Sequence, residues 1–283
     1  RLPEARATVR WSLMTSRLAD LTVRAGTALL LGAVILIALF WGGVVGLAIV
    51  MALIATLATI EFYAIVRRER RLPSELIGLT AVVAMPFAAA AYGAVGLTAV
   101  MGILVISAFF WHVMIRQIRL TDTGVTLFGA IYVGFTLAHV VLVREFGDGM
   151  WLTLVMIVSV WANDSFAYIA GSAFGKHKMA PRISPKKSWE GFVAGTVGTT
   201  AVWLLATQLP GIELAFGWRL AIGLAASAAA VIGDLAESRI KREVGVKDSG
   251  TLLPGHGGYL DRFDSFIMVA IVTYYMLFAA GVR

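Results

Sequence analysis

Two segments in the C-terminal half of the chain carry carboxylates at helical spacing. The first has polar side chains at positions i, i+3, i+4 and i+7, and these are Asp234, Glu237, Ser238 and Lys241. The second has Asp261 and Asp264 at i and i+3, so both lie on one face of a helix. Mg²⁺ prefers oxygen ligands and often takes one or two carboxylates while leaving room for substrate phosphate. The pattern therefore predicts a metal site where two helix ends meet.

Helix capping is the alternative explanation for these acids. A carboxylate in the first turn of a helix interacts favourably with the macrodipole, which would account for Asp261. Asp234 instead lies near the C-terminal end of its predicted helix, where a carboxylate is unfavourable unless a cation lies beside it. Capping thus explains Asp261 but not Asp234.

A further acid, Asp164, follows Asn163 inside an apolar segment predicted as a helix over 150–172. An ionised carboxylate in a membrane costs about 2.5–3.5 kcal/mol even on the most lenient scale. A neighbouring helix could satisfy this group, or it could be protonated. We favour a polar cavity that opens toward the cytoplasm.

Two polar segments, 173–188 and 240–261, carry lysines, hydroxyls and glycines suited to phosphate. Their candidate groups are Ser184, Lys186, Lys187 and Ser188 in the first segment and Lys247 and His256 in the second. The first segment directly precedes an apolar helix, whose N-terminus adds partial positive charge. A basic run at this place is also a common topology signal, and that alternative stays open for Lys186 and Lys187. The spacing of a Walker A loop is absent.

The composition indicates a membrane protein that must position these groups within helices. Of 283 residues, 59% are hydrophobic and 14% charged, against about 45–50% and about 25% in soluble domains. The absence of cysteine excludes a disulfide scaffold, a thiolate zinc site and a cysteine nucleophile. In so apolar a chain, we assign the net charge of +7 to topology or anionic lipid rather than to nucleic acid.

Long charge-free stretches predict the number of membrane spans. One runs from Arg24 to Glu61 and another from Glu75 to Arg116, and each is long enough for two helices of about 20 residues. Glycine-containing turns are predicted at 41–43 and 92–96, and five further spans at 124–144, 150–172, 189–209, 217–239 and 262–281. The sequence thus predicts an all-α polytopic membrane protein with about nine transmembrane helices and a cytoplasm-facing polar cavity.

The basic residues predict the orientation. Nine spans place every Lys and Arg on the side of the N-terminus except Arg144, Arg219 and Arg283. By the positive-inside rule, that side is the cytoplasm. The predicted divisions are a basic amphipathic arm over 1–24, N-terminal transmembrane helices over 25–144, and C-terminal catalytic transmembrane helices with their loops over 145–283.

Residues 238–264 closely resemble the signature of the phosphatidate cytidylyltransferases, also called CDP-diacylglycerol synthases. The stretch reads SRIKREVGVKDSGTLLPGHGGYLDRFD. A second segment, 164–191, contains FGKHKMAPRISPKKSWEG and is also similar to the family. The resemblance implies that CTP and phosphatidic acid are converted to CDP-diacylglycerol and pyrophosphate at a bacterial-type inner (plasma) membrane. It also implies a homodimer in the lipid bilayer and a requirement for Mg²⁺, with a second cation such as K⁺.

The resemblance also implies roles for individual residues. The expected catalytic residues are Asp234, Asp261, Lys187 and Lys241. The expected nucleotide- and phosphate-binding residues are Ser184, Lys187, Ser188, Lys241, Arg242, Lys247 and His256. The expected metal ligands are Asp234 and Asp261, with Asp264 and Asp164 as second-ion or supporting candidates.

Two alternatives belong to other functional classes. A CTP- or ATP-dependent lipid kinase, such as a polyprenol kinase, would use similar metal and phosphate groups but transfer the γ-phosphoryl group. A cation-coupled transporter would also place acids inside membrane helices. Transporters often show inverted repeats with matching broken helices, and the sequence shows none.

Overall fold

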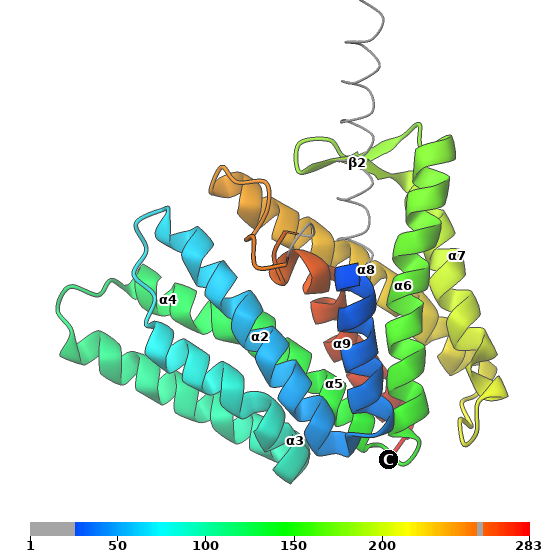
Figure 1. Cartoon of the computed structure of the whole chain (residues 1–283), viewed down its shortest axis with the longest axis horizontal. Helices are drawn as coiled ribbons and strands as arrows, with labels where there is room; N and C mark the ends of the chain where they lie inside the picture. The colour runs from blue at the N-terminus through cyan, green and yellow to red at the C-terminus, as the bar shows by residue number, and fades with distance from the viewer. Residues whose placement is uncertain (1–25, 254–256) are drawn as a thin grey trace, which may run out of the picture.

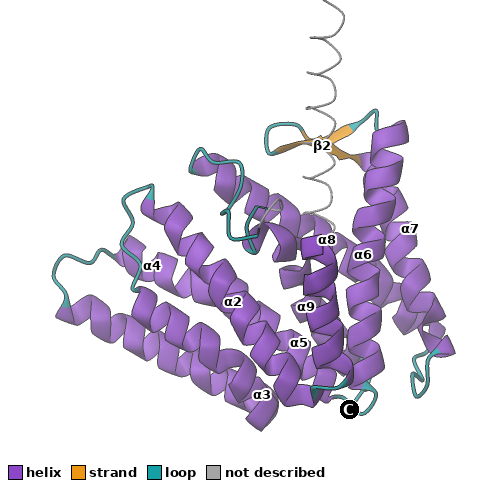
Figure 2. Cartoon of the chain, in the orientation of Figure 1, coloured by secondary structure: helices purple, strands orange, loops and turns teal. Residues whose placement is uncertain are grey.

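The computed structural model describes residues 26–253 and 257–283. Within these residues the fold is almost entirely helical, with one short two-stranded hairpin (Figure 2). Six of the described helices are long and apolar enough to span a membrane: Gly43–Arg67, Glu75–Met114, Leu120–Glu145, Gly149–Phe174, Phe216–Glu243 and Leu260–Ala279. The predicted all-α class is therefore confirmed. The predicted basic arm over 1–24 lies outside the described residues.

The two predicted glycine turns are confirmed. A helix over Gly26–Phe40 is followed by α2 (Gly43–Arg67), and Gly43 at the junction has a φ of +61°. The helix α3 (Glu75–Met114) is interrupted at Gly93, which has a φ of 58° and a ψ of −148°. Its two arms lie side by side and line one shared pocket (Figure 1). Glycine reaches these backbone angles without the strain that a Cβ would cause.

Two of the remaining segments are shorter than an ordinary membrane span of about 20 residues. They are Gly26–Phe40 and α7 (Trp189–Leu205), the second of which continues into a short 3₁₀ turn over Ala206–Gln208. Length and composition alone do not establish either as a span, so the count of nine stays a prediction.

One helical unit runs through the centre of the molecule. It comprises α4 (Leu120–Gly129), a π-helical turn over Ala130–Phe135, and α5 (Thr136–Glu145). This is the most buried of the candidate spans. It packs against α2, α3 and α9 (Leu260–Ala279), so it joins the N-terminal helices to the C-terminal ones (Figure 1).

The C-terminal helices carry the predicted site. α6 (Gly149–Phe174) leads into an antiparallel hairpin of β1 (Lys178–Ala180) and β2 (Ser184–Ser188), and this hairpin replaces part of the expected loop. The Ser188 hydroxyl accepts a hydrogen bond of 3.2 Å from the Gly191 N–H and so caps α7. The chain then passes through α8 (Phe216–Glu243) to α9.

Small residues let these helices approach closely. A Cβ at Gly195 of α7 would meet the Asn163 carbonyl of α6 at 2.9 Å, and one at Gly223 of α8 would meet the Cα of Thr200 at 2.7 Å. A Cβ at Gly233 of α8 would clash with the Asp264 carbonyl of α9. Such contacts are the usual basis of tight helix packing in membranes.

The basic connections lie along one edge of the molecule. The connections 68–74 and 115–119, the β-hairpin and the loop after α8 follow the upper and left edge in Figure 1, whereas the turns at 41–42, 146–148 and 209–215 lie at the opposite edge. This arrangement agrees with the predicted partition of Lys and Arg. Which edge faces the cytoplasm stays a prediction.

Gly223→Ala should lower the thermal unfolding temperature of the detergent-solubilised protein. The added Cβ would press on the backbone of Thr200, and overpacking of this kind costs about 1–3 kcal/mol. The matched control is Gly217→Ala in the same helix, where a Cβ meets nothing within 4 Å. Equal unfolding temperatures for the two variants would contradict the close packing of α7 and α8.

Candidate active site

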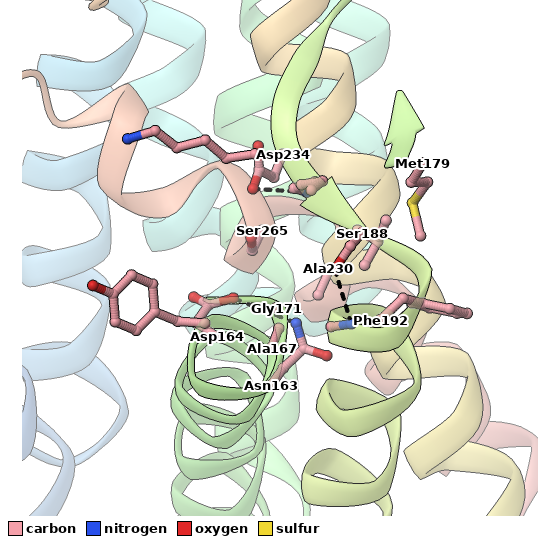
Figure 3. Close-up of a pocket in the computed structure, with 15 residues that line it drawn as sticks. Asn163, Asp164, Ala167, Gly171, Met179, Ser188, Phe192, Ala230, Asp234 and Ser265 are labelled. Carbon is pink, nitrogen blue, oxygen red and sulfur yellow. Dashed lines mark hydrogen bonds and ion pairs between the residues drawn. The ribbon is translucent and has the colours of Figure 1, made fainter. Parts of the chain in front are cut away.

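A cavity of about 260 Å³ lies between α6, α7 and α8, beneath the β-hairpin (Figure 3). Its polar lining comes from four elements and comprises Asn163, Asp164, Lys186, Lys187, Ser188, Asp234 and Ser265. Apolar side chains, including Met179 and Phe192, complete the wall. The cavity therefore gathers the intramembrane acid and the basic segment that the sequence singled out separately.

Three carboxylates interact electrostatically at this cavity. Asp164 of α6 and Asp234 of α8 line it, and Asp264 of α9 interacts with both. Lys187 of β2 reaches into the group, with its Nζ 2.7 Å from an Asp234 carboxylate oxygen. With all four groups ionised, the net charge of the cluster is −2. We call these four side chains the acidic cluster.

Asn163 orients one member of the acidic cluster. Its side-chain Oδ1 accepts hydrogen bonds from the hydroxyls of Ser227 (2.9 Å) and Thr199 (3.3 Å), which come from α8 and α7. The Nδ2 group is then left to donate to Asp164 Oδ1 at 3.3 Å. Asn163 is 4% exposed, so this network joins three helices behind the acid.

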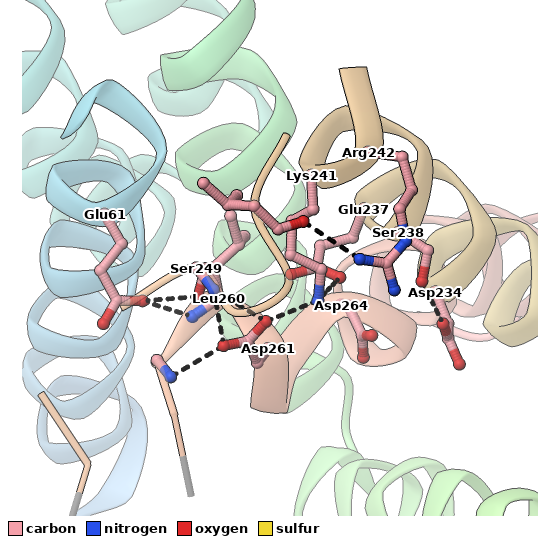
Figure 4. Close-up of polar contacts among 12 residues, drawn as sticks. Glu61, Asp234, Glu237, Ser238, Lys241, Arg242, Ser249, Leu260, Asp261 and Asp264 are labelled. Atoms are coloured by element: carbon pink, nitrogen blue, oxygen red, sulfur yellow. Dashed lines mark hydrogen bonds and ion pairs between the residues drawn. The ribbon is translucent and has the colours of Figure 1, made fainter. Parts of the chain in front are cut away.

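A second polar group lies at the junction of α8 and α9 (Figure 4). Lys241 Nζ lies 2.6 Å from a carboxylate oxygen of Glu237 and 2.6 Å from one of Asp261. Asp261 also accepts hydrogen bonds from the backbone N–H groups of Ser249 (2.9 Å) and Gly258 (2.8 Å). The signature loop is the connection between α8 and α9, which the structure describes over residues 244–253 and 257–259. We call Glu237, Lys241 and Asp261 the loop anchor, because Asp261 holds this loop at Ser249 and Gly258 and Lys241 links Asp261 to α8.

The two acids expected to share a metal therefore lie in different groups. Within the described residues, Asp234 pairs with Lys187 and accepts a hydrogen bond from Ser238 at 3.2 Å. Asp261 already has three protein donors, and its side chain is 7% exposed. The geometry leaves Asp234, with Asp164, at the open cavity and gives Asp261 the surroundings of a structural anchor. Its predicted role as a ligand stays a prediction.

The other predicted phosphate-binding residues are distributed over the same edge. Ser184 begins β2 and is half-buried, and Ser188 lines the cavity. Arg242 donates to the Val246 carbonyl at 3.1 Å, and Lys247 is exposed in the signature loop. His256 lies outside the described residues.

Sequence reasoning missed Glu61 of α2. This carboxylate is 3% exposed and accepts hydrogen bonds from the Leu260 N–H at 2.9 Å and the Ser249 hydroxyl at 3.2 Å. The available signal was an acid at the end of a long charge-free stretch, since acids in membrane helices are costly and usually functional. Its partners lie about two-thirds of the chain away, which no local pattern reveals.

The chemistry of the acidic cluster suits a divalent cation. No three Asp, Glu or His side chains converge as a purely protein-bound metal would require, among the residues that the structure describes. Mg²⁺ does not need such convergence, because it commonly binds one or two carboxylates and completes its shell with water and substrate phosphate. Such an ion would relieve the repulsion among Asp164, Asp234 and Asp264 when all three are ionised.

The chain is similar to known cytidylyltransferases. Residues 22–280 match the family model described as the cytidylyltransferase family. A phosphatidate cytidylyltransferase of Mycobacterium bovis is 35% identical over 252 residues, which are 80% of this chain and 79% of the relative. One from Bacillus subtilis is 39% identical over 160 residues, or 55% of this chain and 58% of the relative. One from Mycobacterium leprae is 42% identical over 159 residues, and this match spans half of that relative's length.

The family match covers both the acidic cluster and the loop anchor, as well as the helices that support them. The match to the Mycobacterium bovis relative extends over most of both chains. On these grounds the chain belongs to the cytidylyltransferase family.

Proposed function

We propose that the protein is a membrane nucleotidyltransferase that converts CTP and phosphatidic acid to CDP-diacylglycerol and pyrophosphate. The observation that carries the proposal is the acidic cluster with Lys187 in a cavity among apolar helices. The names of the relatives supply the substrate class, since each is called a phosphatidate cytidylyltransferase. The proposed role is a step of phospholipid biosynthesis.

The proposed reaction is a direct displacement at phosphorus. A phosphate oxygen of the lipid attacks the α-phosphorus of CTP, and a new phosphorus–oxygen bond forms. The bond between the α-phosphorus and the oxygen bridging to the β-phosphorus breaks, and pyrophosphate leaves with that electron pair. No general base is required, because the attacking phosphate is already ionised. The main obstacle is the repulsion between two anions.

Residues of the cavity can reduce the repulsion between the two anionic substrates. Lys187 lies beside Asp234 and presents a positive charge to an entering phosphate, and the Ser188 hydroxyl lies at the start of α7. Asp234, together with Asp164 or Asp264, would hold Mg²⁺, which supplies charge neutralisation at the nucleotide phosphates. A second cation such as K⁺ belongs to the same proposal. Further phosphate contacts are assigned to Ser184, Lys241, Arg242, Lys247 and His256.

The lipid kinase alternative differs in the product that leaves. A kinase would release a nucleoside diphosphate, because the γ-phosphorus would be attacked, and the two reactions could share the acidic cluster. Family membership favours nucleotidyl transfer. A transporter is disfavoured, because the acids gather at one cavity instead of along a path through the helices.

The decisive assay supplies purified protein with CTP, phosphatidic acid and Mg²⁺. We expect pyrophosphate and CDP-diacylglycerol in equal amounts, and no product when Mg²⁺ is chelated. Release of CDP with a phosphorylated lipid would identify a kinase instead. An Asp234→Asn variant serves as the inactive control for contaminating enzymes.

Asn substitutions separate the two carboxylate groups. Asp234→Asn should lower turnover at least about 100-fold, the loss expected when a preorganised electrostatic group is removed, and should raise the Mg²⁺ concentration for half-maximal rate. Asp261→Asn should instead lower the unfolding temperature, because breaking a buried pair with Lys241 costs about 3–5 kcal/mol. Its residual activity should keep the wild-type Mg²⁺ dependence. An equal shift of Mg²⁺ dependence in both variants would make Asp261 a ligand, as the sequence predicted.

We further propose that the cavity and the N-terminus face the cytoplasm of a bacterial-type inner membrane, and that two copies form a homodimer. Single cysteines at Arg70, Arg182 and Thr251 should resist a membrane-impermeant thiol reagent in intact cells, because all three positions lie on the basic edge. They should react after the cells are permeabilised. Labelling in intact cells would reverse the orientation, and the absence of native cysteine removes background.

A further inference from the structure

The strongest unassigned feature is the contact between Glu61 and the signature loop. Glu61 lies in α2, yet its carboxylate accepts hydrogen bonds from Ser249 within the loop and from Leu260 at the start of α9. Ser249 and Leu260 are 7% and 0% exposed, so the contact is sealed from water. A buried carboxylate requires such donors.

Two glycines of the loop lie against the carboxyl group of Glu61. A Cβ at Gly250 or Gly258 would collide with the carboxyl group of Glu61. Only residues without side chains can therefore lie at these two places while Glu61 keeps its position. The chain that carries the signature is thus shaped around a residue of the N-terminal helices.

Glu61 and Asp261 hold the same piece of loop from opposite sides. The hydroxyl of Ser249 donates to Glu61, whereas its backbone N–H donates to Asp261. Gly258 donates its N–H to Asp261 and packs against Glu61. The loop position is consequently determined by two carboxylates, one from α2 and one from α9.

We propose that Glu61 is a positioning residue for nucleotidyl transfer, which fixes the signature loop and the start of α9 relative to α2. The inference rests on the proposed function, because the loop and α9 carry groups assigned there to phosphate and metal. Glu61 itself is 3% exposed and does not line the cavity. Leu260 begins α9, and Asp264 of the acidic cluster follows one turn later. A shift of the start of α9 would therefore move a carboxylate that is proposed to hold the metal.

The test compares Glu61→Ala with Glu61→Gln. Alanine removes the acceptor, and loss of hydrogen bonds to a charged group corresponds to about 10–150-fold. We expect that decrease in kcat, with the KM for CTP nearly unchanged because no substrate contact is lost. Glutamine keeps one acceptor oxygen and should restore most of the turnover. The matched control is Thr59→Val, a nearly isosteric change at a fully buried position of the same helix, which should retain wild-type kinetics.

A second readout needs no activity. Leu253→Cys places a thiol at a loop position that is 6% exposed, and Ala89→Cys places one at a fully buried position in α3. In the Leu253→Cys protein, Glu61→Ala should speed maleimide labelling by at least about tenfold, the factor expected for one lost hydrogen bond. In the Ala89→Cys protein, the labelling rate should not change. Ser249→Ala removes the same contact from the loop side and should reproduce the loop effect, which covers the case in which Glu61→Ala does not fold.

Three results would overturn the inference. They are unchanged labelling in both reporters, labelling that rises equally in both, and a kcat that stays within about twofold of wild type when the loop label has become accessible. Failure of the proposed function is distinguishable from these. It would appear as absent pyrophosphate release by the wild-type protein, and the labelling comparison would still report whether Glu61 holds the loop.

Discussion

Carboxylates placed among apolar helices require positive charge or hydrogen-bond donors, and this constraint organises the C-terminal half of the protein. Two carboxylates about one turn apart on α8, Asp234 and Glu237, meet this requirement in different ways. Asp234 is paired with Lys187 beside an open cavity, whereas Glu237 and Asp261 share Lys241 in a nearly closed environment. The open group presents Asp164 and Asp234 to the cavity, and the closed group uses its donors to hold the chain together. The group at the open cavity is thus the one available to ligands, and the enclosed group supports the fold.

Close helix packing makes the open group possible. Asp164, Asp234 and Asp264 belong to three different helices, and their side chains are short. Glycines at the contacts let α7 approach α6 and let α8 approach α9, so the carboxylates interact without long side chains. The β-hairpin then brings Lys187 over the cavity from a segment that is not part of the helix bundle. The close approach of the helices brings the three carboxylates together, and Lys187 offsets part of their negative charge.

The N-terminal helices contribute more than membrane anchorage. α2 supplies Glu61 to the signature loop, and the central unit of α4 and α5 packs against both α2 and α9. The loop thereby becomes a shared element of the two halves. The family match over residues 22–280 includes both α2 and the signature loop.

Charge-free length and glycine position are local properties, so the sequence by itself predicted the helical class, the turns at Gly43 and Gly93, and the segments that carry the polar groups. The paired carboxylates and the lysine-bearing segments followed from residue type and spacing, whereas the roles of individual residues came from the resemblance to the family signature and stay predictions. Pairing is a property of packing, and only the tertiary structure showed that Lys187 meets Asp234 and that Asp261 is enclosed by donors. It also revealed Glu61, whose partners lie 188 and 199 positions away along the chain. Helical periodicity places a side chain on a face, but which charge lies opposite depends on how separate helices approach, and no pattern within one helix encodes that.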